Sequence, residues 1–256
     1  FAPGRAARGR NAAATEAVGG RAAFTSPAFG PVGRGSGAAL MALRIVEVYE
    51  ESGRTLTLRE RDGHLDLVLG NVPLLTSRAL GTEHGFGALA ARGLPDATRA
   101  VVVGGLGFGA TLRGVLSVVP AGTRVVVVEK LAAVLRIAET HGKDLVGDVL
   151  SDPRVVLENA DVVDVIARET SLAAILLDVD NGPGWASFRP NARLYAPPGL
   201  ATARDALAPG GVYAVWSGYE EASFVGALRR AGFAPEVVPL HEKGTLAARA
   251  YLGKKP

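Results

Sequence analysis

The chain has 256 residues, of which 48% are hydrophobic and 21% charged, and its formal net charge is +3. This length allows one large domain, or one domain with a small appendage, around a sizeable core. The lack of cysteine excludes disulfides and thiolate metal sites, and the four scattered histidines lack the spacing of zinc ligands. No apolar run approaches the roughly 20 residues of a membrane-spanning helix. We therefore expect neither a metal nor a membrane as a partner.

The positive charge is concentrated at the start of the chain. Residues 1–40 contain five arginines and one glutamate, a balance of +4, which leaves −1 for the remaining residues. The net charge is therefore no indication of nucleic-acid binding, and we expect none. This stretch is rich in Ala, Gly, Arg and Pro without a hydrophobic period, which predicts a disordered leader. It resembles a transit peptide, but the only methionine, Met41, favours an extension upstream of the true start. A cytoplasmic protein is expected, which the lack of cysteine suits.

Residues 41–75 predict a small antiparallel β domain. Segments 45–48, 55–58 and 65–69 are apolar or alternating, and the turns 51–53 and 61–63 separate them. Such runs between glycine turns are typical of a β-meander. A helix is expected at 76–92. Glu83 and His84 lie within it, where a substrate could enter, although a lone histidine is more commonly a surface or capping residue.

From residue 100 onward, short unbroken apolar runs alternate with helical segments. The expected strands are 100–103, 124–128, 155–157, 173–177 and 211–216, and the expected helices are 107–119, 130–141, 160–169, 197–208 and 220–231. Unbroken apolar strands are typical of a parallel sheet covered by helices on both faces. Segments 235–240 and 246–252 predict a closing hairpin with one antiparallel strand. Residues 76–256 therefore predict a doubly wound, Rossmann-like α/β domain.

A glycine-rich turn follows the first of these strands and precedes a helix. It contains Gly104, Gly105, Gly107 and Gly109. Glycines let the chain turn sharply and let a ligand approach the backbone, while the helix N-terminus offers free N–H groups. Such a pattern alone is weak, and its context between strand and helix gives it weight. We predict that this turn binds a nucleoside-type ligand.

Two sets of polar residues follow the next strands. Glu129 ends the second strand, where an acid can bind both ribose hydroxyls. The alternative is an acid near the N-terminus of the next helix that the helix dipole stabilises. Asn159 and Asp161 follow the third strand. Either could bind the amino group of an adenine, while Asp161 could equally cap the next helix.

Asp178, Asp180 and Asn181 follow the fourth strand, at the edge where open α/β sheets bind ligands. Acids at this place could hold a cationic amine or remove its proton. The alternative is an Asx-turn that closes the strand. We take these three residues as the catalytic candidates. Several aromatic side chains after strands four and five could line the pocket or pack in the core: Trp185, Tyr195, Trp216 and Tyr219.

At this point the chain resembles the spermidine synthase-like family of polyamine aminopropyltransferases, which has the class I S-adenosylmethionine-dependent methyltransferase fold. The resemblance covers about residues 64–252. It rests on an ordered set of segments: the turn 103–109 with 111–113, Glu129, 152–155, 176–183, 193–195, 207–212 and 216–217. It implies a seven-stranded sheet whose last strand is antiparallel, preceded by a small N-terminal β domain.

The resemblance also implies roles. Gly104, Gly105 and Gly109 match the family's glycine loop, Glu129 matches its ribose-binding acid, and Asp178 matches the first acid after strand four. In the family these groups hold decarboxylated S-adenosylmethionine and bind and deprotonate a diamine. The homodimer expected as the assembly is likewise implied by the family.

The sequence departs from the family at three places. The family's tyrosine- and histidine-containing stretch before the sheet domain is only loosely matched by residues 77–84. The family's loop reads Gly-Gly-Gly-Asp-Gly-Gly, and residues 106–108 here are Leu-Gly-Phe. The second acid after strand four falls on Asn181, while Asp180 stands one residue early.

We therefore expect a transferase that moves an aminopropyl group from decarboxylated S-adenosylmethionine to an amine or polyamine, without a metal. Aminopropyl transfer from a sulfonium donor to a neutral amine is largely a matter of positioning, because the sulfonium already makes the attached carbon electrophilic. Two alternatives stay open: a methyltransferase that uses S-adenosylmethionine, and a nucleoside-binding protein without catalytic activity.

Overall fold

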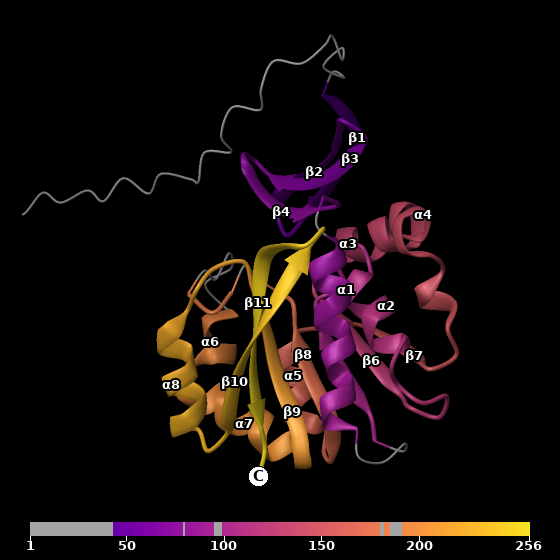
Figure 1. The fold of residues 1–256 in the computed structure, drawn as a ribbon. Coiled ribbons are helices and arrows are strands. Elements are labelled where there is room, and N and C mark those ends of the chain that lie inside the picture. Colours follow the sequence, from indigo (N-terminus) through magenta and orange to yellow (C-terminus); the bar gives the residue numbers. More distant parts are fainter. Residues whose placement is uncertain (1–42, 79, 95–98, 180–181, 185–190) are drawn as a thin grey trace, which may run out of the picture. The chain divides into compact units, whose positions relative to one another are not determined.

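The computed structural model describes residues 43–78, 80–94, 99–179, 182–184 and 191–256 (Figure 1). The chain divides into two units, Phe1–Ala39 and Leu40–Pro256. The expected disordered leader, residues 1–40, lies outside the described residues. The expected domain boundary between residues 75 and 76 falls within the second unit and stays a prediction.

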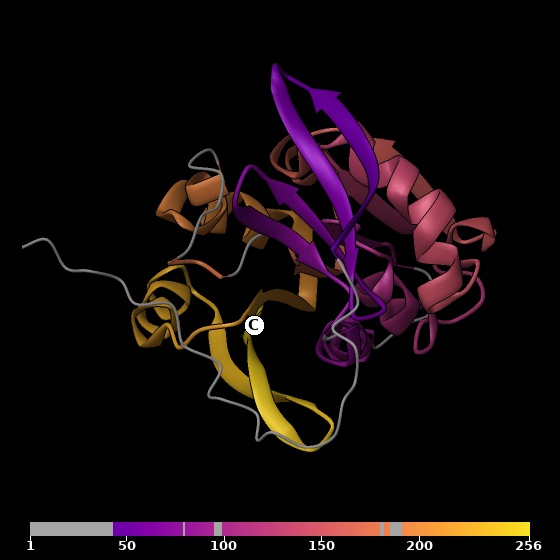
Figure 2. The same cartoon turned by 90° about the horizontal axis from the view of Figure 1, so that it is seen from above.

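A four-stranded antiparallel sheet begins the second unit (Figures 1 and 2). Its strands follow in chain order: β1 (Arg44–Glu51), β2 (Arg54–Arg61), β3 (His64–Leu69) and β4 (Val72–Thr76). The two-residue turn between β1 and β2 has positive φ at Ser52 and Gly53, which matches the right-handed twist of paired strands. The expected meander is thus present, with a fourth strand that the sequence analysis missed. β4 contains Pro73, which an edge strand tolerates.

The second sheet has seven strands in the order β10-β11-β9-β8-β5-β6-β7. Pairing from β7 to β9 is parallel, while β11 is antiparallel to both β9 and β10. The predicted seven-stranded sheet with an antiparallel strand in its closing hairpin is confirmed. The strand bounds are β5 (Val101–Gly104), β6 (Val125–Glu129), β7 (Val155–Asn159), β8 (Leu172–Leu177), β9 (Leu207–Ser217), β10 (Ala234–Glu242) and β11 (Thr245–Lys254).

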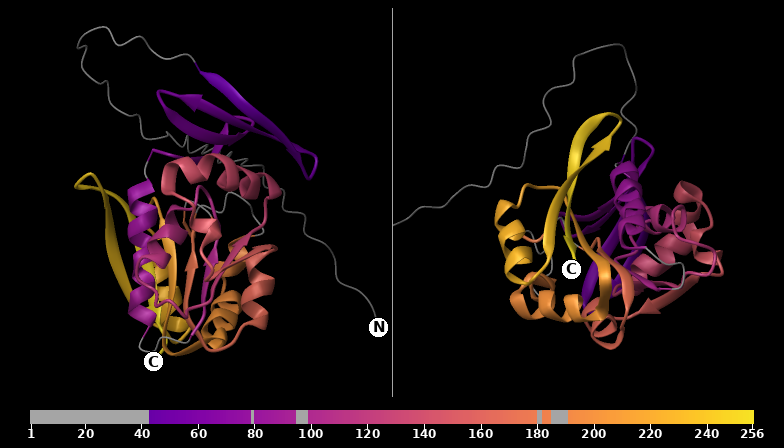
Figure 3. Two further views of the ribbon diagram at one scale, coloured as in Figure 1. Left: turned by 90° about the vertical axis from the view of Figure 1, so that its right-hand side faces the viewer. Right: turned by 60° about the horizontal axis from the view of Figure 1, so that its bottom comes forward.

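Helices cover both faces of this sheet (Figure 3). The main helices are α1 (Leu80–Ala88), α2 (Ala110–Leu116), α3 (Ala132–Ile137), α5 (Val162–Arg168), α7 (Pro197–Ala206) and α8 (Ala222–Arg230). The short ones are η1 (Leu89–Gly93), the π-helical turn η2 (Ala138–Gly142), α4 (Lys143–Val146), η3 (Val149–Ser151) and α6 (Ala192–Tyr195). The helix expected from residue 76 begins only at Leu80, and β4 extends through Thr76. None of the helices in the described ranges is long and apolar enough to cross a membrane.

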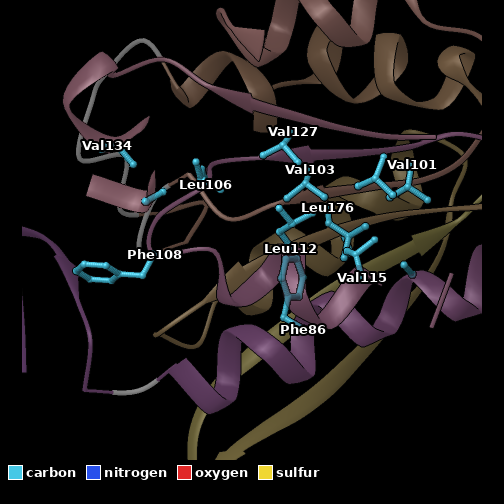
Figure 4. Close-up of a cluster of buried hydrophobic side chains, with 14 of the residues drawn as sticks. Phe86, Val101, Val103, Leu106, Phe108, Leu112, Val115, Val127, Val134 and Leu176 are labelled. Carbon is cyan, nitrogen blue, oxygen red and sulfur yellow. The ribbon is translucent and has the colours of Figure 1, made fainter. Parts of the chain in front are cut away.

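The core divides into two apolar clusters, one on each face of the seven-stranded sheet. Val101 and Val103 of β5 belong to the first, together with residues of α1, α2 and α3, while Val102 belongs to the second, with residues of α5, α7 and α8. This division follows from the alternation of side chains along a strand. Figure 4 shows the first cluster, in which Phe86 of α1 lies close to Leu112 of α2. These two clusters pack against both faces of the sheet and so stabilise the edge at which the candidate site lies.

Candidate functional site

A cavity of about 380 Å³ lies where the parallel strands end. Its wall comes from the turn after β5 and from residues that follow β6, β7 and β8. The four-stranded sheet and α1 complete it. The order of the strands in the sheet reverses between the neighbouring parallel strands β5 and β8. Open α/β sheets bind ligands outside the carboxyl ends of their strands at such a switch point. The predicted ligand edge is thus a real cavity, and its size suits a small molecule.

The glycine-rich turn requires glycine for two distinct reasons. Gly105 has φ of +87°, and a Cβ there would collide with the backbone carbonyl of Asp178. Gly109 has φ of +95° and directly precedes α2. These glycines therefore bring β5, β8 and α2 together closely, and Gly105 and Gly107 line the cavity.

The two bulky residues of this turn, Leu106 and Phe108, are core residues. Each keeps 3% or less of its surface exposed, and both belong to the first apolar cluster. In Figure 4 they lie at the end of the cluster opposite Val101, near Val134. The departure of this loop from an all-small sequence is therefore explained by packing beneath the cavity.

Glu129 ends β6 and is almost fully buried in the cavity wall. Its Oε2 accepts a hydrogen bond from the N–H of Leu106 at 3.0 Å, and its Oε1 accepts one from the N–H of Leu131 at 2.8 Å. Burial raises the pKa of this carboxyl, and the backbone N–H groups of Leu131, Leu106 and Lys130 partly offset that rise. Glu129 thus fixes the glycine-rich turn, and each oxygen keeps a lone pair for a ligand hydroxyl.

The two candidates after β7 have different surroundings. The Nδ2 of Asn159 donates to the carbonyl oxygens of Glu129 at 2.9 Å and Lys130 at 3.1 Å, and Asn159 is not part of the cavity wall. Asp161 lines the cavity and caps α5, because its Oδ1 accepts from the N–H of Val163. The cap on α5 is therefore present, and the role of Asp161 in binding an adenine stays a prediction.

Asp161 is also ion-paired with Lys130 and Arg193. Burial acts to raise its pKa, but the hydrogen bonds from Lys130 and the N–H of Val163 outweigh burial and lower it. Asp161 is therefore a stable carboxylate at neutral pH.

Asp178 follows β8 and lines the cavity beside the glycine-rich turn. Its Oδ2 accepts a hydrogen bond of 2.6 Å from the hydroxyl of Thr111 on α2. Burial raises the pKa of Asp178 to about 6, against the lowering effect of Thr111. An acid with such a pKa can take up and release a proton near neutral pH. Asp180 and Asn181, the other two catalytic candidates, lie outside the described residues.

Glu83, on α1, had no role assigned from the sequence beyond lying where a substrate could enter. It lines the same cavity, and its pKa is raised well above the usual value by burial, then by the negative charges of Asp178 and Glu242. Its neighbour His84 instead lines a separate cavity together with Arg113. The available sequence signal was an acid in a helix that leads into the sheet domain.

The four-stranded sheet contributes the second set of residues that the sequence did not reveal. Glu51, Ser52 and Arg54 from the β1–β2 turn line the cavity. The two carboxylate oxygens of Glu51 accept hydrogen bonds from the N–H groups of Ala132 at 2.7 Å and Ala133 at 2.9 Å. This carboxylate therefore caps α3 from another sheet and fixes the turn beside the cavity.

Aromatic candidates are divided between wall and core. Trp216, at the end of β9, lines the cavity. Tyr195 packs edge-to-face on Phe224 in the second apolar cluster, with ring centroids 5.9 Å apart. Tyr219 is 43% exposed, and Trp185 lies outside the described residues. Within the described ranges, the structure contains no group of three or more His, Cys, Asp or Glu side chains that could hold a metal ion.

The doubly wound sheet, the antiparallel β11 and the glycine-rich turn at the switch point define a Rossmann-like α/β fold. No model of a protein family matches the chain, and no curated protein matches it. Solved structures do match. A spermidine synthase in complex with the transition-state analogue AdoDATO gives a TM-score of 0.65 at 17% identity, covering 83% of this chain and 73% of that chain.

Two further structures give the same result. Spermidine synthase from Thermotoga maritima gives a TM-score of 0.66 at 18% identity, with 83% of this chain and 73% of that chain covered. A probable spermidine synthase from Corynebacterium glutamicum ATCC 13032 gives 0.58 at 18% identity, with 82% and 80% covered. The chain therefore has a spermidine synthase-like fold, as the resemblance predicted.

Proposed function

We propose that the protein transfers an aminopropyl group from decarboxylated S-adenosylmethionine to the nitrogen of an amine. The supporting observation is one cavity that reaches from Glu129 on β6, across the glycine-rich turn, to Asp178 after β8. The end proposed to bind the nucleoside and the end that carries Asp178 are thus adjacent. The spermidine synthase-like fold agrees with this proposal.

The nucleoside end offers the groups that an adenosyl moiety needs. Glu129 would accept hydrogen bonds from the ribose hydroxyls, and Asp161 would accept one from the adenine amino group. Leu131 and Val162 supply apolar wall for the base. The glycine-rich turn lets the ligand approach the backbone closely.

The charge of the wall suits cationic substrates. Among the described residues, five acids line the cavity (Glu51, Glu83, Glu129, Asp161 and Asp178), against the two cations Arg54 and Lys130. A sulfonium donor and an ammonium acceptor are both positively charged, so an acidic wall favours binding of both.

The chain's own residues would position the amine and move its proton. The bound donor supplies an electrophilic carbon next to a positively charged sulfur. Asp178 would take the proton of the acceptor nitrogen, whose lone pair then forms the new N–C bond. The C–S bond breaks, its electron pair stays on sulfur, and a neutral thioether, methylthioadenosine, leaves.

Parallel calorimetric titration of the full chain tests this proposal with methylthioadenosine, decarboxylated S-adenosylmethionine and S-adenosylmethionine. Preference for the first two would support aminopropyl transfer, and product formation with a diamine panel would complete the test. Binding of none of the three would refute the proposal.

A methyltransferase is the second candidate, and Arg54 is the observation that favours it. A donor that keeps its carboxylate needs a cation or free N–H groups nearby, and Arg54 lies in the cavity wall. If the parent protein binds S-adenosylmethionine more tightly than its decarboxylated form, and Arg54→Gln reverses this preference, the methyltransferase alternative would be supported.

A further inference from the structure

The approach of α1 to α2 places Glu83 beside the catalytic candidate Asp178. A Cβ at Gly87 of α1 would collide with the carbonyl of Thr111, and a Cβ at Gly114 of α2 would collide with the carbonyl of His84. Two glycines thus allow backbone-to-backbone contact between these helices. The first turn of α1 is therefore held in place by packing, and Glu83 has a fixed position.

Thr111 connects the two acids. Its hydroxyl lies 2.6 Å from Oδ2 of Asp178, to which it donates, and 3.4 Å from the backbone carbonyl of Glu83. Both acids line the same cavity. The charge of Asp178 raises the pKa of Glu83, as expected when two carboxyls are close.

The carboxylate of Glu83 has no hydrogen bond or ion pair within the part of the chain that the structure describes. The group is nevertheless densely surrounded by protein, and what surface Glu83 keeps opens to the cavity. Oε2 of Glu242 lies beside Gly81 in the first turn of α1. This oxygen is buried and also has no hydrogen-bond partner among the described residues. Buried carboxylates without partners are unfavourable, so a functional ligand is the expected explanation.

An ammonium group is the ligand that would satisfy the carboxylates of Glu83 and Asp178. The surrounding charges are the acids Asp178 and Glu242, while Arg54 and Lys130 belong to parts of the wall built by β2 and the end of β6. The ring of Trp216 lines the same cavity, and aromatic faces attract cations. A protonated amine would neutralise the repulsion and donate to both carboxylates.

We infer that Glu83 is the second carboxylate of the acceptor site, and that it holds the attacking nitrogen of the amine while Asp178 takes its proton. This inference rests on the proposed function. In the proton balance, the ammonium loses one proton to Asp178, and the neutral nitrogen forms the N–C bond as the C–S bond breaks. The product nitrogen is then a secondary ammonium, the sulfur is a neutral thioether, and Asp178 releases its proton to solvent. An acid on α1 thus supplies the charge that the loop after β8 lacks at Asn181.

The test compares Glu83→Gln with Glu139→Gln in the full chain. Glu139 is an exposed helical acid, so its variant matches the change of charge without touching the cavity. Each protein is titrated with methylthioadenosine, then with 1,4-diaminobutane in the presence of saturating methylthioadenosine. Initial rates with decarboxylated S-adenosylmethionine are measured in parallel. Glu83→Asp serves as the conservative variant, and thermal unfolding shows that each variant is folded.

We expect Glu83→Gln to keep the affinity for methylthioadenosine within about twofold, and to weaken diamine binding and raise its KM by about tenfold or more. Glu83→Asp should recover part of this loss, and Glu139→Gln should behave as the parent. Equal diamine affinity and KM in parent and Glu83→Gln would overturn the inference, as would a parent that binds methylthioadenosine but no amine. Failure to bind any of the nucleosides would instead overturn the proposed function.

Discussion

Replacing Glu129 by Gln tests the interpretation of this acid as both a binding residue and a support of the glycine-rich turn. Its two carboxylate oxygens accept from the N–H groups of Leu106 and Leu131. A glutamine keeps one acceptor oxygen and turns an NH₂ group toward the other N–H. One charge-assisted hydrogen bond, of about 1.5–3 kcal/mol, is therefore lost and a buried donor is left unpaired.

Relief from burying a charge offsets part of this loss, because burial raises the pKa of Glu129. We therefore expect the free energy of unfolding to fall by about 1–2 kcal/mol at pH 7. For a domain of this size, that change lowers Tm by roughly 2–8 °C. Methylthioadenosine affinity should fall by about fivefold to a hundredfold, which is the loss of a charged partner for the ribose.

Urea unfolding followed by circular dichroism measures the first effect, and calorimetry measures the second. Glu139→Gln is the control for removal of one negative charge at an exposed position. Unchanged stability of Glu129→Gln would refute the view that its two backbone hydrogen bonds outweigh the cost of burial. Unchanged affinity would remove Glu129 from the nucleoside site.

Three further predictions concern stability and its dependence on pH. The pKa of Asp178 is about 6 in the folded protein against 3.8 in an unfolded chain, so the stability that this group contributes is fully present below pH 3.8 and is lost as pH rises through 6. In urea unfolding measured over a series of pH values, Asp178→Asn should flatten the fall in stability over this range, and an unchanged slope of stability against pH would contradict the prediction. Gly105→Ala should destabilise the protein by more than about 3 kcal/mol, since its Cβ meets backbone, whereas Gly122→Ala, in open space, should unfold like the parent. Glu51→Gln should lower stability by about 1 kcal/mol through a weaker cap on α3; an equal or higher unfolding midpoint would refute this role.

Much of the fold could be predicted because β5, β6 and β8, the central parallel strands, are buried on both faces. Unbroken apolar runs such as 101–103 and 173–177 have no other good location than a covered parallel sheet. β4, α4 and α6 were missed, since they have five residues or fewer and carry no complete hydrophobic period.

The site was predictable where function depends on position along a strand. Glu129, Asp161 and Asp178 each follow a strand of one parallel sheet, so a correct sheet brings them to one edge. Their binding and catalytic roles, with those of Asp180 and Asn181, stay predictions, as does the homodimer. Glu51 and Glu83 come from elements whose contact with that edge depends on tertiary packing, which no local pattern encodes.

The hydrogen bonds between Glu51 and the start of α3 have a consequence for local opening. The β1–β2 turn forms part of the wall around the proposed nucleoside site, so a ligand there contacts both sheets at once. Ligand binding then adds its free energy to the opening of β1 and β2, as well as to that of β5 and β6. Amide hydrogens of β1 and β2 should therefore exchange more slowly with solvent deuterium when methylthioadenosine is bound, although those strands belong to a different sheet from the one that carries the glycine-rich turn.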